Sequence, residues 1–291
     1  MGILLAILAS MGYASSRVLA AVGLKEIKPL TIALISGASS LVMALVLTLV
    51  FEFEELFSVS LAAIGWFALL GINNYVFARS LTFAGIKHIG ASRSTPIYAT
   101  FPLFTMVFAR AFLKESITPT LWLGALLIVA GLVILLSEGE QRQPVSGGGK
   151  YAAGIIFSLA SAAVYGIGTV ITKWGVTHLA SPLVGATLSL TAGTLVLFLV
   201  AGKDFVVSTK AYRREAAFSA FAGLAAAIGL ISMYVALSIA PAVIVTPLSG
   251  TSPLFTVLGT HLFLRKFEKV TNRVVLSVVM VVVGGILVST S

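Results

Sequence analysis

Cysteine is absent from this chain of 291 residues, and charged residues make up only 10% of it. The absence of cysteine excludes disulfide bonds and thiol chemistry, and it leaves the redox compartment unassigned. Hydrophobic residues account for 58% of the chain, and its mean hydropathy is +1.08. Such a composition excludes a soluble globular domain, so we expect most of the chain to lie in lipid.

Acidic side chains are scarce, and none falls inside an expected membrane span. The ten acidic residues lie in connections or at helix ends: Glu26, Glu52, Glu54, Glu55, Glu115, Glu138, Glu140, Asp204, Glu215 and Glu268. A proton-driven exporter of lipophilic cations typically needs a carboxylate in the membrane, and this chain offers none. His88, His178 and His261 lie near span ends, where a solvated histidine is the simpler interpretation. We therefore expect an anionic or zwitterionic substrate, carried by exchange or facilitated diffusion.

Catalytic and cofactor motifs are also missing. The sequence contains no Gly-x-Ser-x-Gly, no His-Glu-x-x-His and no nucleotide-binding loop, so we expect no enzyme activity, no cofactor and no metal site. No arginine-rich arm suggests a nucleic-acid surface. The net charge of +9 is explained instead by membrane topology and by attraction to anionic lipid. An intramembrane enzyme and a passive channel are the alternatives from other classes.

Long hydrophobic runs are the main feature that is present. A helix of about 20 apolar residues crosses a bilayer, and ten such runs lie at residues 3–22, 30–51, 61–81, 88–110, 120–137, 151–173, 182–202, 216–238, 241–264 and 273–290. Their continuity favours helices over the alternating strands of an outer-membrane barrel. No basic leader or cleavage motif marks the first run, so we expect a permanent helix there. The expected fold is an all-α integral membrane protein with ten transmembrane helices.

A repeat divides these spans into two halves. Residues 95–105 reappear 151 positions later as residues 246–256, and the match extends without a gap over residues 83–113 and 234–264. A segment rich in charge, proline and glycine separates five spans from five. We predict a first repeat over residues 1–137, a linker over 138–150 and a second repeat over 151–291. Because each repeat has an odd number of spans, the two repeats have opposite orientations, as in an inverted-repeat transporter.

Each copy holds two prolines six residues apart inside an apolar run: Pro96 and Pro102, then Pro247 and Pro253. Proline has no amide hydrogen, so the helix there loses hydrogen bonds and frees backbone carbonyls, those of Ser92, Tyr98, Val243 and Ser249. Nearby hydroxyls, on Thr95, Tyr98, Thr246 and Ser249, either satisfy the backbone or bind substrate. Substrate sites of repeat transporters form where paired broken helices meet. We therefore expect a central site between the fourth and ninth helices, worked by alternating access.

Three arginines, Arg17, Arg79 and Arg93, fall inside predicted spans or near their ends. A guanidinium near mid-bilayer costs at least about 2.5 kcal/mol to insert, so it normally faces a polar interior and has a partner. Arg17 and Arg79 are close enough to span ends to reach lipid headgroups, which is the alternative to a role at the site. Arg93 lies three residues before Pro96 and is the preferred residue for binding a carboxylate or phosphate.

Further polar residues complete the candidate site. Asn73, Asn74 and Tyr234 either line the same cavity or hydrogen-bond between helices. Tyr13 and Tyr165 lie on the paired first and sixth helices. Two alignments of these helices are possible: Tyr13 with Tyr165, or Met11-Gly12 with Tyr165-Gly166. The glycines of the fifth and tenth helices suit close helix contact, either within the monomer or at the seam of a homodimer. They are Gly124, Gly131, Gly284 and Gly285.

Basic residues are distributed unequally between the two sides of the membrane. The connections after odd-numbered helices hold Lys25, Lys28, Lys87, Arg142, Lys150, Lys203, Lys210, Arg213, Arg214, Arg265, Lys266, Lys269 and Arg273, whereas the other side holds Arg110, Lys114 and Lys173. The positive-inside rule therefore places the odd connections in the cytoplasm and both termini outside.

Several short motifs, in this order, resemble the EamA family of the drug/metabolite transporter superfamily. They are Pro-Leu-Phe-Thr at residues 102–105 and 253–256, the charged segments Leu-Lys-Glu at 113–115 and Leu-Arg-Lys-Phe-Glu at 264–268, and Tyr165-Gly166 followed by Lys173. The resemblance covers nearly the whole chain. It implies an inner-membrane permease that exports amino acids or related metabolites through a central cavity, with helices 3, 4, 8 and 9 among its walls.

The membrane orientation and the substrate each have two interpretations. The resemblance implies cytoplasmic termini and a basic connection between the second and third helices, whereas residues 52–55 are mostly acidic here. The orientation deduced from charge therefore competes with the one that the family implies. For the substrate, a sugar-phosphate or nucleotide-sugar exchanger of the same superfamily is the alternative to an amino-acid exporter.

Overall fold

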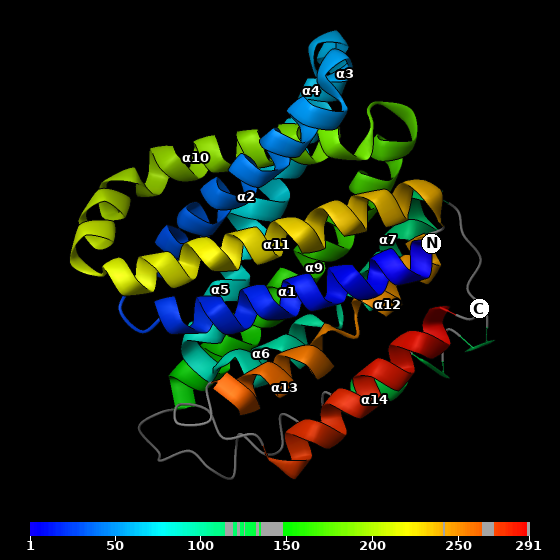
Figure 1. Ribbon diagram of the computed structural model, residues 1–291. Coiled ribbons are helices and arrows are strands. Elements are labelled where there is room, and N and C mark those ends of the chain that lie inside the picture. Colours follow the sequence, from blue (N-terminus) through cyan, green and yellow to red (C-terminus); the bar gives the residue numbers. More distant parts are fainter. Residues whose placement is uncertain are drawn as a thin grey trace.

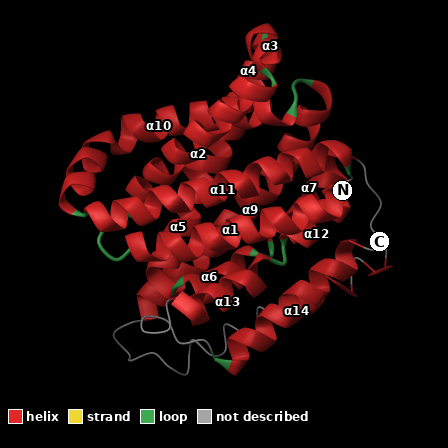
Figure 2. Ribbon diagram, viewed as in Figure 1, coloured by secondary structure: helices red, strands yellow, loops and turns green. Residues whose placement is uncertain are grey.

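The computed structural model describes residues 1–113, 119–120, 123–124, 126–131, 134, 148–240, 242–263 and 271–289, and within these ranges the chain is helical, with no strand (Figure 2). The first half contains α1 (Gly2–Gly23), α2 (Pro29–Phe51), α3 (Phe53–Ser58), α4 (Leu61–Gly71), the π-helix η1 (Ile72–Ala78), α5 (Arg79–Ile89), α6 (Ala91–Tyr98) and α7 (Phe101–Leu113). The second half contains α9 (Gly148–His178), α10 (Pro182–Ala211), α11 (Arg213–Ile239), α12 (Ala242–Ser249), α13 (Ser252–Phe263) and α14 (Asn272–Ser289) (Figure 1).

Six described helices are long and apolar enough to cross a membrane: Gly2–Gly23, Pro29–Phe51, Leu61–Ile89, Gly149–His178, Pro182–Ala211 and Arg213–Ile239. The third of these helices, Leu61–Ile89, is longer than the run expected at residues 61–81, because α4, η1 and α5 continue without a break as far as Gly90. Gly90 adopts a φ of 81° and ends the helix, a conformation that glycine accepts without steric cost. The helix α9 begins at Gly148, so it includes the last three residues of the expected linker.

The fourth and ninth expected spans are each divided into two helices, α6 with α7 and α12 with α13, at equivalent positions of the repeat. At the first break the Thr100 hydroxyl donates to the Ile97 carbonyl at 2.7 Å, and at the second the Thr251 hydroxyl donates to the Leu248 carbonyl at 2.7 Å. The hydrogen-bond pattern is thus the same in both copies, and these threonines satisfy the backbone locally.

Hydroxyl groups tie the first half of the chain to the second. The helix α2 packs along α10 and α11, α1 along α11, and α5 along α9. Serine and threonine side chains cross these contacts: Ser40 Oγ to the Gly223 carbonyl at 2.7 Å, Thr48 to Thr187 at 2.7 Å, Thr82 to Ser161 at 2.7 Å and Ser94 to Ser158 at 2.9 Å. Such bonds hold helices together in lipid, where apolar contact alone gives no preference for protein over lipid tails.

The fifth expected span, residues 120–137, and the linker residues 138–147 lie largely outside the described residues. Where the fifth span is described, it packs on α14, because a Cβ added at Gly284 would lie 2.6 Å from the Gly124 carbonyl oxygen. These glycines therefore serve a contact within the monomer. A homodimer through the same helices stays a prediction.

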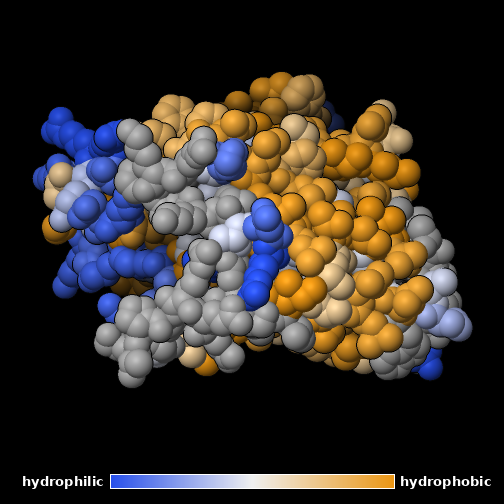
Figure 3. All heavy atoms as spheres, turned by 90° about the horizontal axis from the view of Figure 1, so that it is seen from below, coloured by the Kyte–Doolittle hydropathy of each residue, from blue (hydrophilic) through white to orange (hydrophobic). Residues whose placement is uncertain are grey.

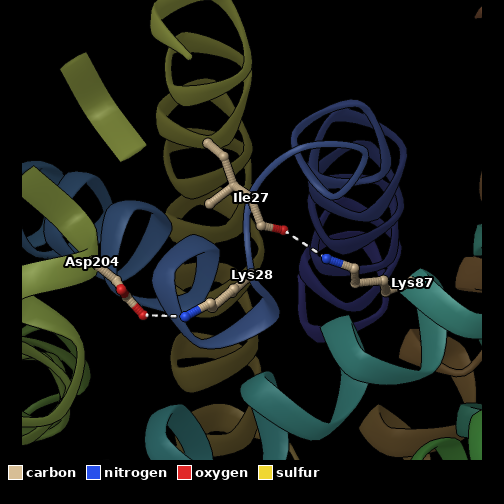
Figure 4. A network of polar contacts seen from close by, with 4 residues as sticks. All are labelled: Ile27, Lys28, Lys87 and Asp204. Carbon is tan, nitrogen blue, oxygen red and sulfur yellow. Dashed lines mark hydrogen bonds and ion pairs between the residues drawn. The ribbon is translucent and has the colours of Figure 1, made fainter. Parts of the chain in front are cut away.

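The two ends of the helix bundle differ in their surface chemistry. The helix α1 begins and α14 ends toward one side, while the α1–α2 and α10–α11 connections lie toward the other (Figure 1). Seen from below, hydrophilic atoms gather at the end of these connections and hydrophobic atoms form a broad band beside them (Figure 3). At that end Lys28 Nζ meets Asp204 Oδ2 at 2.9 Å, and Lys87 Nζ donates to the Ile27 carbonyl at 3.3 Å (Figure 4).

Candidate functional site

Side chains from both halves converge on a small central cavity. Its walls come from α1, η1, α6, α7, α9, α11, α12 and α13: Tyr13, Arg17, Asn74, Tyr98, Phe101, Tyr165, Thr169, Thr172, Leu230, Met233, Tyr234, Leu237, Ser249 and Ser252. The cavity volume is about 30 Å³, which is room for about two water molecules. The cavity is therefore closed to a metabolite, which does not fit there without movement of the helices.

Arg17 supplies a positive charge at this cavity. Its side chain is only 6% exposed, and its Nη1 donates to Ser252 Oγ at 2.9 Å. Its guanidinium carbon lies 4.2 Å from the centre of the Tyr98 ring, within the range of a cation–π interaction. A guanidinium carries five N–H donors, and the bond to Ser252 uses one of them. Because no acidic residue is among the described lining residues, the charge is available to an anionic ligand.

Aromatic rings form the wall of the cavity beside Arg17. The Tyr98 and Tyr165 rings meet edge to face, with centroids 5.2 Å apart, and the Phe101 ring lies 5.5 Å from that of Tyr98. Tyr234, on α11, is fixed by a 3.1 Å hydrogen bond between its hydroxyl and Ser189 Oγ on α10. The rings come from α6, α7, α9 and α11, so the wall spans both halves of the chain.

The π-helix η1 brings two consecutive asparagines toward α9. Asn73 Nδ2 donates to Asn74 Oδ1 at 3.0 Å and to the Val164 carbonyl at 3.0 Å. Asn74 lines the cavity and is 5% exposed. Close packing against Gly168 holds the pair in place, since a Cβ there would lie 2.2 Å from Asn74 Oδ1. Single π-type turns inside longer helices occur frequently at functional sites.

Seven of the residues that the sequence suggests for substrate binding line the cavity: Tyr13, Arg17, Asn74, Tyr98, Tyr165, Tyr234 and Ser249. The remaining six, Asn73, Arg79, Ser92, Arg93, Thr95 and Thr246, do not. Asn73 supports Asn74, and Thr246 Oγ1 donates to the Ala242 carbonyl at 2.7 Å. Ser92 and Thr95 are buried on α6.

The other two candidate arginines, Arg79 and Arg93, are not among the residues that line the cavity. Arg79 is 5% exposed, its guanidinium carbon lies 4.9 Å from the Tyr75 ring centre, and its Nη1 has no hydrogen-bond partner among the described residues. Arg93 is half-buried, and its buried Nε likewise has no partner within the described part of the chain. The position of Arg93 therefore gives no support for a role in substrate binding, whereas Arg17 lines the cavity.

Several lining residues were not suggested by the sequence. Thr169 and Thr172 follow Tyr165 by four and seven positions on α9, which places all three on one face of the helix. That spacing is a signal that could have found them. Ser252 aligns with Phe101 at the repeat distance of 151 residues, but only the fold shows that it meets Arg17.

Comparisons with known proteins agree with this architecture. A sequence model of the EamA-like transporter family matches residues 1–137 and 152–290. An uncharacterized transporter from Clostridium kluyveri is 29% identical over 110 residues, which is 38% of this chain and 35% of that protein. This chain therefore spans about a third of the length of that curated relative. A solved crystal structure aligns over 98% of this chain and 95% of that chain, with a TM-score of 0.68 and 17% identity. At this identity the likeness concerns the fold alone.

Proposed function

Since this chain belongs to the EamA-like transporter family, we propose that it is a secondary transporter of a small anionic or zwitterionic metabolite, with amino acids as the first class to test. The names of the family and of the relative point to a membrane transporter and not to an enzyme. The observation that carries the substrate class is Arg17, a buried guanidinium at a central cavity whose described lining contains no carboxylate.

The proposed architecture has ten transmembrane helices in two inverted five-helix repeats within the inner cell membrane. Six long apolar helices and two pairs of shorter broken helices support this arrangement. The repeat boundaries proposed from the sequence, 1–137 and 151–291, lie close to the two segments that match the family.

The proposed mechanism is alternating access around the central cavity. A cavity of about 30 Å³ is far smaller than the roughly 300–1,000 Å³ of typical small-molecule sites, so binding requires the halves to separate on one side. The breaks between α6 and α7 and between α12 and α13 interrupt the helices beside the site, and they provide natural hinges. Arg17 then binds the anionic group of the substrate, with Tyr98 and Tyr165 as an aromatic wall.

Counterflow in proteoliposomes tests this proposal with amino acids, organic acids and phosphate compounds. A charge-assisted hydrogen bond contributes about 1.5–3 kcal/mol, so Arg17→Gln should weaken the affinity for the transported anion by roughly ten- to a hundredfold. Arg213→Gln is the matched control, because it makes the same change at an exposed position at the start of α11.

An Arg17→Gln protein that stays folded and transports its anionic substrate with unchanged affinity would contradict the role of Arg17. Exchange stimulated by phosphate compounds and not by amino acids would assign the chain to the sugar-phosphate or nucleotide-sugar alternative. Currents far above carrier turnover would instead identify a passive channel.

A further inference from the structure

A second cavity lies away from the central one, on the outer surface of the bundle where α1 runs between α11 and α13. It is a groove of about 500 Å³, large enough for a small-molecule ligand. Apolar side chains form most of its lining: Val18, Leu19 and Val22 on α1, Phe218 on α11, and Phe255 and Phe263 on α13. Two small residues, Ser15 and Gly259, also line the groove, and Lys25, Arg214 and Glu215 complete the lining.

The charged residues of the groove are all at one end. Lys25 follows the last turn of α1, and Arg214 and Glu215 belong to the first turn of α11. From Lys25 to Ser15 the groove follows α1 for about 15 Å at the helical rise of 1.5 Å per residue. This length is about half of the 30 Å hydrocarbon core of a bilayer. The groove therefore has the polarity and the depth of one leaflet, with a charged entrance and an apolar interior.

The sequence repeat shows that the α13 wall of this groove differs from the equivalent helix of the first copy, α7. At the repeat distance of 151 residues, Phe255 aligns with Phe104 and Phe263 with Phe112, but Gly259 aligns with Phe108. Glycine thus stands where the first copy has a large aromatic side chain. A Cβ added at Gly259 would lie 3.1 Å from Val18 Cγ2, so a phenylalanine at this position would occupy the groove.

We propose that the groove binds one acyl chain of an anionic phospholipid, with the lipid phosphate held by Arg214 and Lys25. Among the described lining residues, two basic side chains and one acidic side chain give a net charge of +1, which favours the single negative charge of a phosphodiester. Arg214 lies with its guanidinium carbon 5.9 Å from the Phe218 ring centre, so its charge lies directly above an apolar wall. Basic residues near the surface of an anionic leaflet each favour binding by roughly fivefold.

The site joins the two halves of the chain. The helix α1 belongs to the first half, whereas α11 and α13 belong to the second. A lipid chain in the groove therefore contacts both halves at once, beside the helix that carries Arg17. We expect an occupied groove to stabilise the closed state against separation of the halves.

Native mass spectrometry of the purified full-length protein tests the proposal with phosphatidylglycerol and phosphatidylcholine of the same acyl chains. The wild type should retain one phosphatidylglycerol in preference to phosphatidylcholine, and Arg214→Gln should lower this retention by roughly fivefold. Lys203→Gln removes a basic charge from an exposed position of α10 that does not line the groove, and it should retain the lipid like the wild type. Equal loss in both variants, or no loss in Arg214→Gln, would overturn the proposal.

A photoactivatable phosphatidylglycerol, with its reactive group on the acyl chain, locates the chain independently of charge. Cross-links should map to peptides of α1, α11 and α13 that line the groove, and Gly259→Phe should reduce them at least severalfold in protein that remains folded. Cross-links spread evenly over α2 and α10, or undiminished in folded Gly259→Phe protein, would show that the groove does not hold the acyl chain.

Discussion

Replacing Gly168 by alanine should disturb the central site through its asparagines. Gly168 lies on α9 opposite the π-helix, where an added Cβ would be 2.2 Å from Asn74 Oδ1 and 2.7 Å from Asn73 Nδ2. These distances are shorter than any van der Waals contact, so the two side chains must move. Movement of Asn73 breaks its 3.0 Å bond to the Val164 carbonyl, and movement of Asn74 changes the cavity wall.

The change in stability caused by Gly168→Ala is the sum of two destabilising contributions and one stabilising contribution. Overpacking a well-filled interior costs about 1–3 kcal/mol, and the one hydrogen bond between the two helices, from Asn73 Nδ2 to the Val164 carbonyl, contributes about 0.6 kcal/mol. Alanine gains about 1 kcal/mol over glycine in a helix. The net destabilisation of Gly168→Ala is therefore about 1–3 kcal/mol, and substrate affinity should fall with it.

Gly65→Ala is the matched control. Gly65 is also in an apolar helix, α4, but a Cβ added there meets no atom within 4 Å. This variant should be stabilised by about 1 kcal/mol, so the two proteins should differ by about 2–4 kcal/mol in resistance to thermal or denaturant unfolding. Equal stability and equal transport in the two variants would refute the proposed contact between α9 and η1.

Four further predictions concern single groups. Lys173→Met should destabilise the end of α11 by about 1–2 kcal/mol in thermal unfolding, because Lys173 Nζ donates to the Leu237 carbonyl at 2.7 Å and the Ala240 carbonyl at 3.2 Å. Glu52→Gln should cost about 1 kcal/mol in the same assay, since Glu52 accepts from Ser181 Oγ and the Val184 amide at the start of α10. Arg93→Ala should retain substrate affinity in the counterflow assay, and a tenfold loss would restore Arg93 as the binding residue. Reporters fused at Ser291 should be active only in the periplasmic form, and activity only of the cytoplasmic form would reverse the orientation deduced from charge.

Much of the fold could be predicted because lipid imposes a simple rule on the chain. A span needs about 20 apolar residues, and these runs mark the helices that begin at Gly2, Pro29 and Pro182 to within a residue or two. The π-helix could not be predicted, since residues 72–78 carry no proline, glycine or other signal for a changed helical pitch. The extension of α5 to Ile89 was missed for a related reason: polar residues near its end lower the hydropathy without ending the helix.

The positions of the arginines could not be predicted from hydropathy, because hydropathy does not show which face of a membrane helix is buried. In α1 the buried residues Ala6, Ala9 and Ala14 are apolar, and so are the exposed residues Ile3, Leu4 and Leu8. Lipid-facing and protein-facing sides are thus both apolar, and hydropathy alone does not show which face points inward. Arg17 was therefore equally consistent with reaching the headgroups, and proximity to Pro96 favoured Arg93. The burial of Arg17 against Tyr98 and Ser252 depends on the rotation of α1 within the bundle, which only the packing of its neighbours determines.

The cavity also resolves how a repeated chain can make an asymmetric site. If Tyr13 aligns with Tyr165, Arg17 aligns with Thr169, and at the repeat distance of 151 residues Tyr98 aligns with Ser249 and Phe101 with Ser252. All eight residues of these four pairs line the cavity, which favours this register over the one that begins at Met11. The first copy contributes a cation and three aromatic rings, whereas the second contributes one aromatic ring and three hydroxyls.

A ligand with an anionic group beside a flat or apolar part fits the first copy, and its remaining hydrogen-bonding groups meet the hydroxyls of the second. Exchanging Arg17 and Thr169 in one protein would test this argument, because a symmetric site would tolerate the exchange and the proposed site would lose the cation–π contact with Tyr98 and its affinity for anions.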